Sequence, residues 1–105
     1  MKLHVDVRGQ GFPILCLHGH PGSGRALRVF TEALGSQGQT LAPDLRGYGR
    51  SRTRTPFEMA AHLDDLEALI ASRQLQRYLL LGWSLGGILA LELALRQPQQ
   101  VSGLI

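Results

Sequence analysis

The sequence predicts an α/β fold: a three-layer αβα arrangement in which a mostly parallel sheet carries helices on both faces. Two observations lead to this prediction. Short apolar or alternating runs, typical of strands, alternate along the chain with longer stretches whose apolar residues recur at helical spacing, and glycine-marked turns follow several of them. The composition, with 44% hydrophobic and 18% charged residues over 105 positions, is that of one ordinary globular domain.

The first two predicted elements are strands. Near the N-terminus, Leu3, Val5 and Val7 alternate with polar residues, as in a strand with one face in solvent, and a glycine turn follows. The continuous apolar run at 13–17 fits a strand that is covered on both faces. Cys16 lies in this run, so we expect a buried, unreactive thiol, and a lone cysteine fits a reducing compartment.

A helix and a short strand come next. An amphipathic helix is predicted over 25–36, because apolar residues recur there at helical spacing: Val29, Phe30, Ala33 and Leu34. A strand is predicted over 40–43 and leads into a glycine-marked turn.

The second helix has the clearest start signal in the chain. Thr55 is placed as the N-cap, Pro56 at the first helical position, and Glu58 to complete a capping box. One face is predicted to be apolar and to pack on the sheet, and the opposite face to be polar. The apolar residues are Met59, Leu63, Leu66, Leu69 and Ile70, and the polar ones are Asp64, Asp65 and Glu67.

The last predicted elements surround one serine. A short apolar strand is predicted over 78–83 and a helix over 85–97, which Pro98 ends, and Val101 begins one more strand. Ser84 therefore lies at the junction of a strand and a helix. Gly82 and Gly86 flank it, and the absence of side chains there permits the tight turn that exposes a nucleophilic serine.

A second motif follows the earlier buried strand. The sequence His18-Gly19-His20-Pro21-Gly22 forms a loop that can direct a backbone N–H towards the same reaction centre. Acyl transfer requires such donors, because the carbonyl oxygen becomes anionic as the carbon becomes tetrahedral. The two expected donors are the backbone N–H groups of Leu85 and His20.

These two motifs, with the stretch Asp-Leu-Arg-Gly-Tyr-Gly-Arg-Ser at 44–51 between them, resemble the α/β-hydrolase fold family, over nearly the whole chain. The resemblance implies an enzyme without a cofactor that hydrolyses an ester, amide or activated carbon–carbon bond of a small molecule. It implies that Ser84 is the nucleophile, with the oxyanion hole formed by the Leu85 and His20 N–H groups. Dehalogenases and soluble epoxide hydrolases of this fold carry an aspartate where this chain has Ser84.

The order of catalytic residues raises a further expectation. In this family the acid and then the histidine follow the nucleophile, but after Ser84 the chain contains one acidic residue, Glu92, and no histidine. We therefore expect residues 1–105 to be the N-terminal part of a single α/β-hydrolase domain, inactive as a fragment. The alternative is a non-catalytic remnant or binding module that a separate C-terminal half completes. In either case an unpaired edge of the sheet is expected to cause self-association.

Other polar residues receive structural predictions. His18 is expected to fix its loop by hydrogen bonding, while His4 and His62 are expected to face solvent. Asp44 and Arg46 are expected to bond to backbone groups or to each other. Trp83 either faces the substrate pocket or packs under the turn.

Several functional classes are disfavoured. The histidines lack the spacing of metal ligands, and no Gly-x-Gly-x-x-Gly precedes Asp44, so neither a metal site nor a nucleotide site is predicted. The net charge of +3 reflects one arginine-rich stretch in which Tyr48 is the only interleaved aromatic residue, which disfavours nucleic-acid binding. No signal peptide and no membrane-spanning run is seen, so we expect a cytoplasmic protein with no membrane partner.

Overall fold

The fold is described by a computed structural model that covers residues 1–54 and 57–105. In these residues the chain forms five strands, three α-helices and one 3-10 helix, η1. Their order is β1 (Val5–Arg8), β2 (Pro13–Leu17), η1 (Gly24–Leu27), α1 (Arg28–Leu34), β3 (Gln39–Pro43), α2 (Met59–Ser72), β4 (Tyr78–Gly82), α3 (Leu85–Arg96) and β5 (Val101–Leu104).

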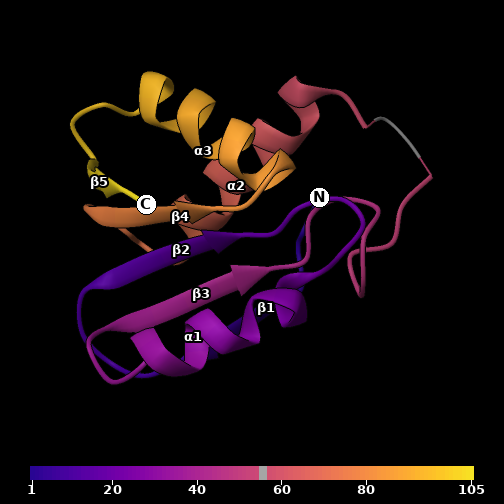
Figure 1. Cartoon of the computed structure of the whole chain (residues 1–105). Helices are drawn as coiled ribbons and strands as arrows, with labels where there is room; N and C mark the ends of the chain where they lie inside the picture. The colour runs from indigo at the N-terminus through magenta and orange to yellow at the C-terminus, as the bar shows by residue number, and fades with distance from the viewer. Residues whose placement is uncertain (55–56) are drawn as a thin grey trace.

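The strands form one sheet in the order β1-β3-β2-β4-β5. β1 runs antiparallel to β3, and all other neighbours are parallel. In the centre of the sheet, Leu15 of β2 is in register with Leu41 of β3 and Leu80 of β4. Helices α2 and α3 cover one face and α1 covers the other (Figure 1). The predicted three-layer αβα class with a mostly parallel sheet is confirmed.

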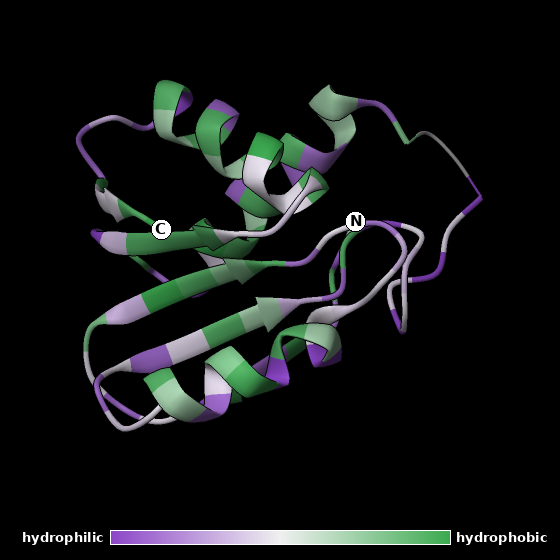
Figure 2. Cartoon of the chain, viewed as in Figure 1, coloured by the Kyte–Doolittle hydropathy of each residue, from purple (hydrophilic) through white to green (hydrophobic). Residues whose placement is uncertain are grey.

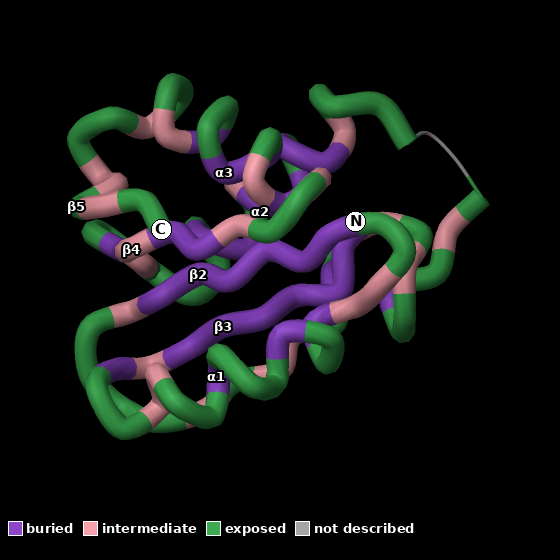
Figure 3. Tube along the Cα trace, in the orientation of Figure 1, coloured by how far each residue is buried: buried purple, intermediate pink, exposed green. Residues whose placement is uncertain are grey.

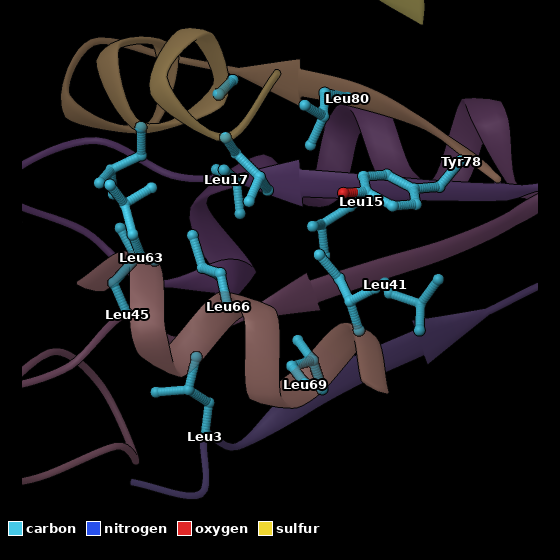
Figure 4. Close-up of a cluster of buried hydrophobic side chains, with 14 residues drawn as sticks. Leu3, Leu15, Leu17, Leu41, Leu45, Leu63, Leu66, Leu69, Tyr78 and Leu80 are labelled. Carbon is cyan, nitrogen blue, oxygen red and sulfur yellow. The ribbon is translucent and has the colours of Figure 1, made fainter. Parts of the chain in front are cut away.

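The alternation of side chains on the central strand produces two cores. The middle strands are rich in apolar residues (Figure 2) and are buried along most of their length (Figure 3). Leu15 and Leu17 point to the side of α2 and α3, where they join the larger cluster with Leu66 and Tyr78 (Figure 4). Each fully buried leucine contributes about 1.5–3 kcal/mol, so this cluster provides most of the hydrophobic stabilisation.

The opposite face of β2 carries the smaller core. Ile14 and Cys16 pack there with Leu27, Ala42 and Leu81. Burial raises the pKa of the Cys16 thiol to about 12, as expected for an inert cysteine.

The prediction for the first helix was right in place and wrong in orientation. Val29, predicted on the packed face, is 78% exposed, and Phe30 is also exposed. The residues that face the sheet are Leu27 and Thr31, which are buried, and Leu34, which packs against the smaller core. The 3-10 turn at 24–27 sets this phase, since positions 27, 31 and 34 then fall on one side.

The predicted start of the second helix was also wrong. Helix α2 begins at Met59, and Glu58 is its N-cap residue, with an extended backbone and no side-chain capping bond. Thr55 and Pro56 lie outside the described residues. The ring of Phe57 packs on Gly47, where an added Cβ would lie 2.1 Å from ring carbon Cε1. This contact holds the chain extended just before the helix.

Two polar residues of α2 occupy unexpected places. Asp65, predicted on the polar face, is buried, and His62, predicted to face solvent, is also buried. Met59, predicted on the packed face, is exposed instead. Asp65 tolerates burial because Arg46 and the N-terminal amine of Met1 donate hydrogen bonds to it.

Apolar surface remains exposed at one end of the sheet. Among the described strands, β5 pairs only with β4, so its outer edge is open. Next to it, α3 exposes three apolar residues at helical spacing, Ile88, Leu91 and Leu95.

No helix within the described ranges is long and apolar enough to cross a membrane.

Candidate functional site

Ser84 occupies a strained turn at the carboxyl end of β4. Its φ of 57° and ψ of −116° lie outside the regions that a serine ordinarily adopts, at a cost of about 1–3 kcal/mol. Ser84 is the N-cap residue of α3, but its side chain makes no capping hydrogen bond. The residue is exposed. The turn thus places the Ser84 hydroxyl at the surface, where it makes no hydrogen bond to the N-terminus of the helix.

The glycines on either side make this turn sterically feasible. A Cβ on Gly82 would lie 2.5 Å from the carbonyl oxygen of Gly86, and a Cβ on Gly86 would lie 2.0 Å from that of Leu17. Real Cβ atoms do not approach so closely. The first turn of α3 can therefore pack against both β4 and β2 only because these side chains are absent.

The loop after β2 lies directly against Ser84. A Cβ on Gly19 would stand 2.9 Å from the Cβ of Ser84 and 2.8 Å from the carbonyl oxygen of Trp83. The Trp83 N–H also donates to the Leu17 carbonyl at 3.0 Å. The structure therefore brings together the two motifs that lie some 65 positions apart in the sequence.

His18 fixes this loop, as predicted. Its Nε2 accepts the backbone N–H of Leu45 at 3.0 Å, and its Nδ1 lies 2.8 Å from the carbonyl oxygen of Gly19. Because Nε2 accepts a hydrogen bond, Nδ1 carries the proton and donates it, which describes a neutral ring. Burial lowers the pKa of His18 and outweighs the opposing effects of the Gly19 bond and the Asp44 charge.

The side chain of His20 turns towards the loop at 44–51. Its Nδ1 lies 2.6 Å from the hydroxyl of Tyr48, and the two rings meet edge to face. Tyr48, which the sequence did not single out, also packs against His18. In the described part of the chain, no hydrogen bond joins Ser84 to an imidazole.

Asp44 and Arg46 have separate structural roles. The Asp44 carboxylate accepts the backbone N–H groups of Gly24 and Arg50, at 2.7 and 2.9 Å, so the prediction of backbone bonding is confirmed. Arg46 instead makes two bonds to Asp65, at 2.7 and 2.9 Å. Burial alone would raise the pKa of Asp65, but these bonds and that of the N-terminal amine hold the pKa below its usual value.

Two hollows flank the Ser84 turn. The first has a volume of about 310 Å³ and is lined by Gly19, His20, Pro21, Ala26, Leu27, Phe30 and Trp83. The second has a volume of about 350 Å³ and is lined by His20, Gly47, Tyr48, Phe57, Met59, His62 and Leu85. Trp83 is 64% exposed and so does not pack under the turn. The second hollow is lined mainly by apolar groups, as binding sites for small organic molecules usually are, and the first has a mixed polar and apolar lining.

His62 was missed as a residue of this region. Its Nδ1 is buried without a hydrogen-bond partner, and burial lowers its pKa, with smaller effects from Asp65, Arg46 and His18. The sequence did contain a signal, since His62 stands four residues before Leu66 and seven before Leu69, on the buried stripe of the helix.

Other groups do not join the site. Glu92 lies exposed on the helix that follows Ser84, and His4 is exposed beside β1, as expected. Within residues 1–54 and 57–105, no group of three or more potential ligands could hold a metal ion.

Comparisons with known proteins agree with this geometry. Residues 13–105 match the family model described as alpha/beta hydrolase fold. A pimeloyl-[acyl-carrier protein] methyl ester esterase of Edwardsiella ictaluri is 38% identical over 88% of the chain, and a haloalkane dehalogenase of Mesorhizobium japonicum is 33% identical over 96%. A solved marine microorganism esterase is 29% identical over 98% of the chain, with a TM-score of 0.94. The chain spans 34%, 33% and 40% of these proteins, respectively.

Proposed function

Because the chain belongs to the α/β hydrolase family, we propose that Ser84 is the nucleophile of a serine hydrolase that acts through an acyl-serine intermediate. The observation that carries this proposal is the backbone of Ser84. A strained φ and ψ at an exposed serine, whose hydroxyl does not cap the helix that it precedes, has no structural purpose of its own.

The surroundings of Ser84 support a specific first step. The Ser84 oxygen attacks the substrate carbonyl, and the carbonyl oxygen becomes an anion. The Leu85 N–H lies in the first turn of α3, where backbone donors lack intrahelical acceptors. Together with the His20 N–H on the adjacent loop, it forms the oxyanion hole, and each such donor contributes about 3 kcal/mol to transition-state stabilisation.

The proton balance requires a base. As the oxygen attacks, the serine proton passes to the base, which then delivers it to the leaving group when the tetrahedral intermediate collapses to the acyl-serine. Water hydrolyses the acyl-serine in the second half of the reaction. The rings of His18, His20 and His62 are turned to other contacts or buried, so we place the histidine and its acidic partner outside residues 1–105. The chain is then the N-terminal part of one hydrolase domain.

The proposed substrate is a small ester, amide or activated carbon–carbon compound with an apolar group beside the carbonyl. The two hollows next to Ser84 offer aromatic and aliphatic walls for its acyl and leaving groups, including Trp83 on one side and Phe57 on the other. The esterase among the relatives favours the ester. An aspartate at this turn would form an alkyl ester in dehalogenation or epoxide opening, but this chain has Ser84.

Fluorophosphonate labelling followed by peptide mass spectrometry tests the proposal. An oxyanion hole retains some rate enhancement without its base, so we expect Ser84 to be phosphonylated at least about tenfold faster than the other serines of the folded chain. Unfolding in urea should abolish this preference, and Ser84→Ala should remove the modified peptide. Equal labelling of all serines would contradict the proposal.

A second candidate is a non-catalytic binding module that pairs with a separate polypeptide. The absence of a hydrogen bond between Ser84 and any imidazole of the described residues favours it. It predicts no preference for Ser84 in the labelling experiment, even when the folded chain is complemented by the remainder of a relative's domain.

A further inference from the structure

A charged hollow lies beside the edge strand β1, away from Ser84. Its volume is about 310 Å³. Its lining consists of His4, Asp6, Arg8, Arg25, Arg28, Asp44 and Arg50. None of these residues lines the two hollows that flank Ser84. The site is therefore separate from the proposed hydrolytic centre and does not rest on it.

The hollow forms because one face of β1 is polar. His4, Asp6 and Arg8 alternate along the chain and so project to one side of the strand, whereas Leu3 and Val5 on the other side join the larger core. From the sequence pattern alone, this polar face of the first strand was predicted to be exposed to solvent. In the structure this face is opposed by arginines from two regions that are distant in sequence: the continuous segment of η1 and the start of α1, and the loop after β3.

A network of hydrogen bonds holds the arginine-bearing segments in place. Asp44 accepts the backbone N–H groups of Gly24, next to Arg25, and of Arg50 itself. The loop is also tied to β1, because the Asp44 N–H donates to the His4 carbonyl at 2.8 Å and the His4 N–H donates to the Ser51 hydroxyl at 2.9 Å. The backbone positions from which Arg25 and Arg50 extend are thus fixed before any ligand arrives.

The charges in the hollow do not balance. Four arginines face two carboxylates, which leaves two positive charges. Asp6 is paired with Arg8 at 3.3 Å, and both oxygens of Asp44 accept backbone N–H groups. Arg28 pairs with the exposed Glu32, which does not line the hollow. Neither Arg25 nor Arg50 forms an ion pair among the residues that the structure describes.

We propose that this hollow binds the phosphate group of a small phosphate monoester, held by Arg25, Arg28 and Arg50. A phosphate monoester is close to doubly negative at neutral pH, and Arg25 and Arg50 supply two guanidinium groups that form no ion pair among the described residues. Its terminal oxygens also suit guanidinium groups, which bind phosphate with paired hydrogen bonds. The hollow is larger than a phosphate group, so part of the organic portion also fits inside it.

Calorimetric titration of the whole chain with phenyl phosphate at pH 7.5 and low ionic strength tests this proposal. We expect saturable binding at one site, roughly tenfold tighter than that of phenyl sulfate or benzoate, which carry a single charge. Equal affinity for phenyl phosphate and phenyl sulfate would overturn it, because a patch of solvated arginines would not distinguish them.

Matched variants locate the site. Arg25→Gln and Arg50→Gln should each weaken phenyl phosphate binding roughly tenfold, while Arg73→Gln, at the end of α2, should have no effect. Near-identical affinities in all three variants, with unchanged thermal unfolding, would overturn the proposal. Ser84→Ala should bind phenyl phosphate normally, which separates this site from the hydrolytic proposal.

A lipid headgroup could supply the same phosphate chemistry. Co-sedimentation with phosphatidylcholine vesicles that contain phosphatidic acid distinguishes the two sources. The proposal predicts that phenyl phosphate in solution binds and that the vesicles do not retain the protein. Retention on these vesicles without measurable phenyl phosphate binding would assign the hollow to a membrane surface and overturn the small-molecule proposal.

Discussion

Gly86 of α3 and Leu17 of β2 are in direct backbone contact, since a Cβ on Gly86 would stand 2.0 Å from the Leu17 carbonyl oxygen. This contact seats the start of α3 against the central strand. It thereby places Ser84 beside the loop that follows β2, where His20 lies. The proposed nucleophile and one of its oxyanion donors owe their proximity to a missing side chain.

The first prediction compares two neighbouring glycines. Gly86→Ala should lower the free energy of unfolding by about 3 kcal/mol or more, because either β2 or α3 must move. Gly87→Ala is the control, since its Cβ would meet Gly82 backbone at an ordinary 3.6 Å. Alanine favours helix there by about 1 kcal/mol, so Gly87→Ala should be neutral or stabilising. Urea unfolding followed by circular dichroism measures both, and equal stabilities would contradict the steric argument.

The second prediction concerns the ion pair of the partly buried Arg46 and the buried Asp65. Arg46→Met should lower the free energy of unfolding, because the buried Asp65 carboxylate then loses two of its hydrogen bonds and keeps that of the Met1 amine. The double variant Arg46→Met with Asp65→Leu should recover part of this loss, since the buried carboxylate is removed while the more exposed Met1 amine loses its partner. A double-mutant cycle in urea checks the coupling, and additive effects would show that the pair does not act as a unit.

The third prediction is a loss of stability in mild acid. Burial lowers the pKa values of both His18 and His62 from the ordinary 6.5. Between 6.5 and the lowered values, the unfolded chain binds protons that the folded chain does not. The free energy of unfolding should therefore be unaffected by these groups above pH 6.5 and fall below it, by at most about 1.4 kcal/mol per pH unit for each histidine.

Variants assign this pH effect to individual residues. His62→Leu should reduce the slope below pH 6.5 and raise the stability at pH 5, since it also removes the unpartnered Nδ1. An identical slope in His62→Leu and the unaltered chain would contradict the assignment.

The fourth prediction concerns self-association, which the open edge of β5 and the exposed face of α3 favour. Light scattering after size-exclusion chromatography should show species larger than the 11.5 kDa chain that dissociate on dilution. Leu104→Lys places a charge on the edge strand, and Leu91→Lys places one on the helix face. The variant that restores the monomer identifies the surface, and a monomer at all concentrations in the unaltered chain would refute the prediction.

Much of the fold followed from local patterns in the sequence. The five strands and the three helices were predicted because each is strongly apolar or periodic, and most are bounded on at least one side by glycine or proline. The orientation of α1 was not predictable from periodicity, because the 3-10 turn before it sets which residues face the sheet. The prediction of where α2 begins was wrong for a similar reason, since the packing of Phe57 on Gly47 competes with a local capping signal.

The candidate site was predictable where backbone geometry defines it. The glycines around Ser84 and Gly19 after His18 indicate that backbone segments approach each other closely at these positions, and this depends only on the absence of a side chain. The partners of long side chains were not predictable: Arg46 reaches Asp65 across 19 positions, and His20 reaches Tyr48 across 28. The burial of Asp65 depends on the contact with Arg46, so the helical pattern alone placed it in solvent, whereas His62 shares the apolar stripe with Leu66 and Leu69 and its burial was predictable from that spacing.

The most direct test of the hydrolytic account is a crystal structure of the chain phosphonylated at Ser84. The account predicts that one phosphonyl oxygen lies about 2.7–3.1 Å from the backbone nitrogens of both Leu85 and His20, in the place of the transition-state oxyanion. A phosphonyl oxygen that points to solvent, with neither N–H within hydrogen-bond distance, would contradict it.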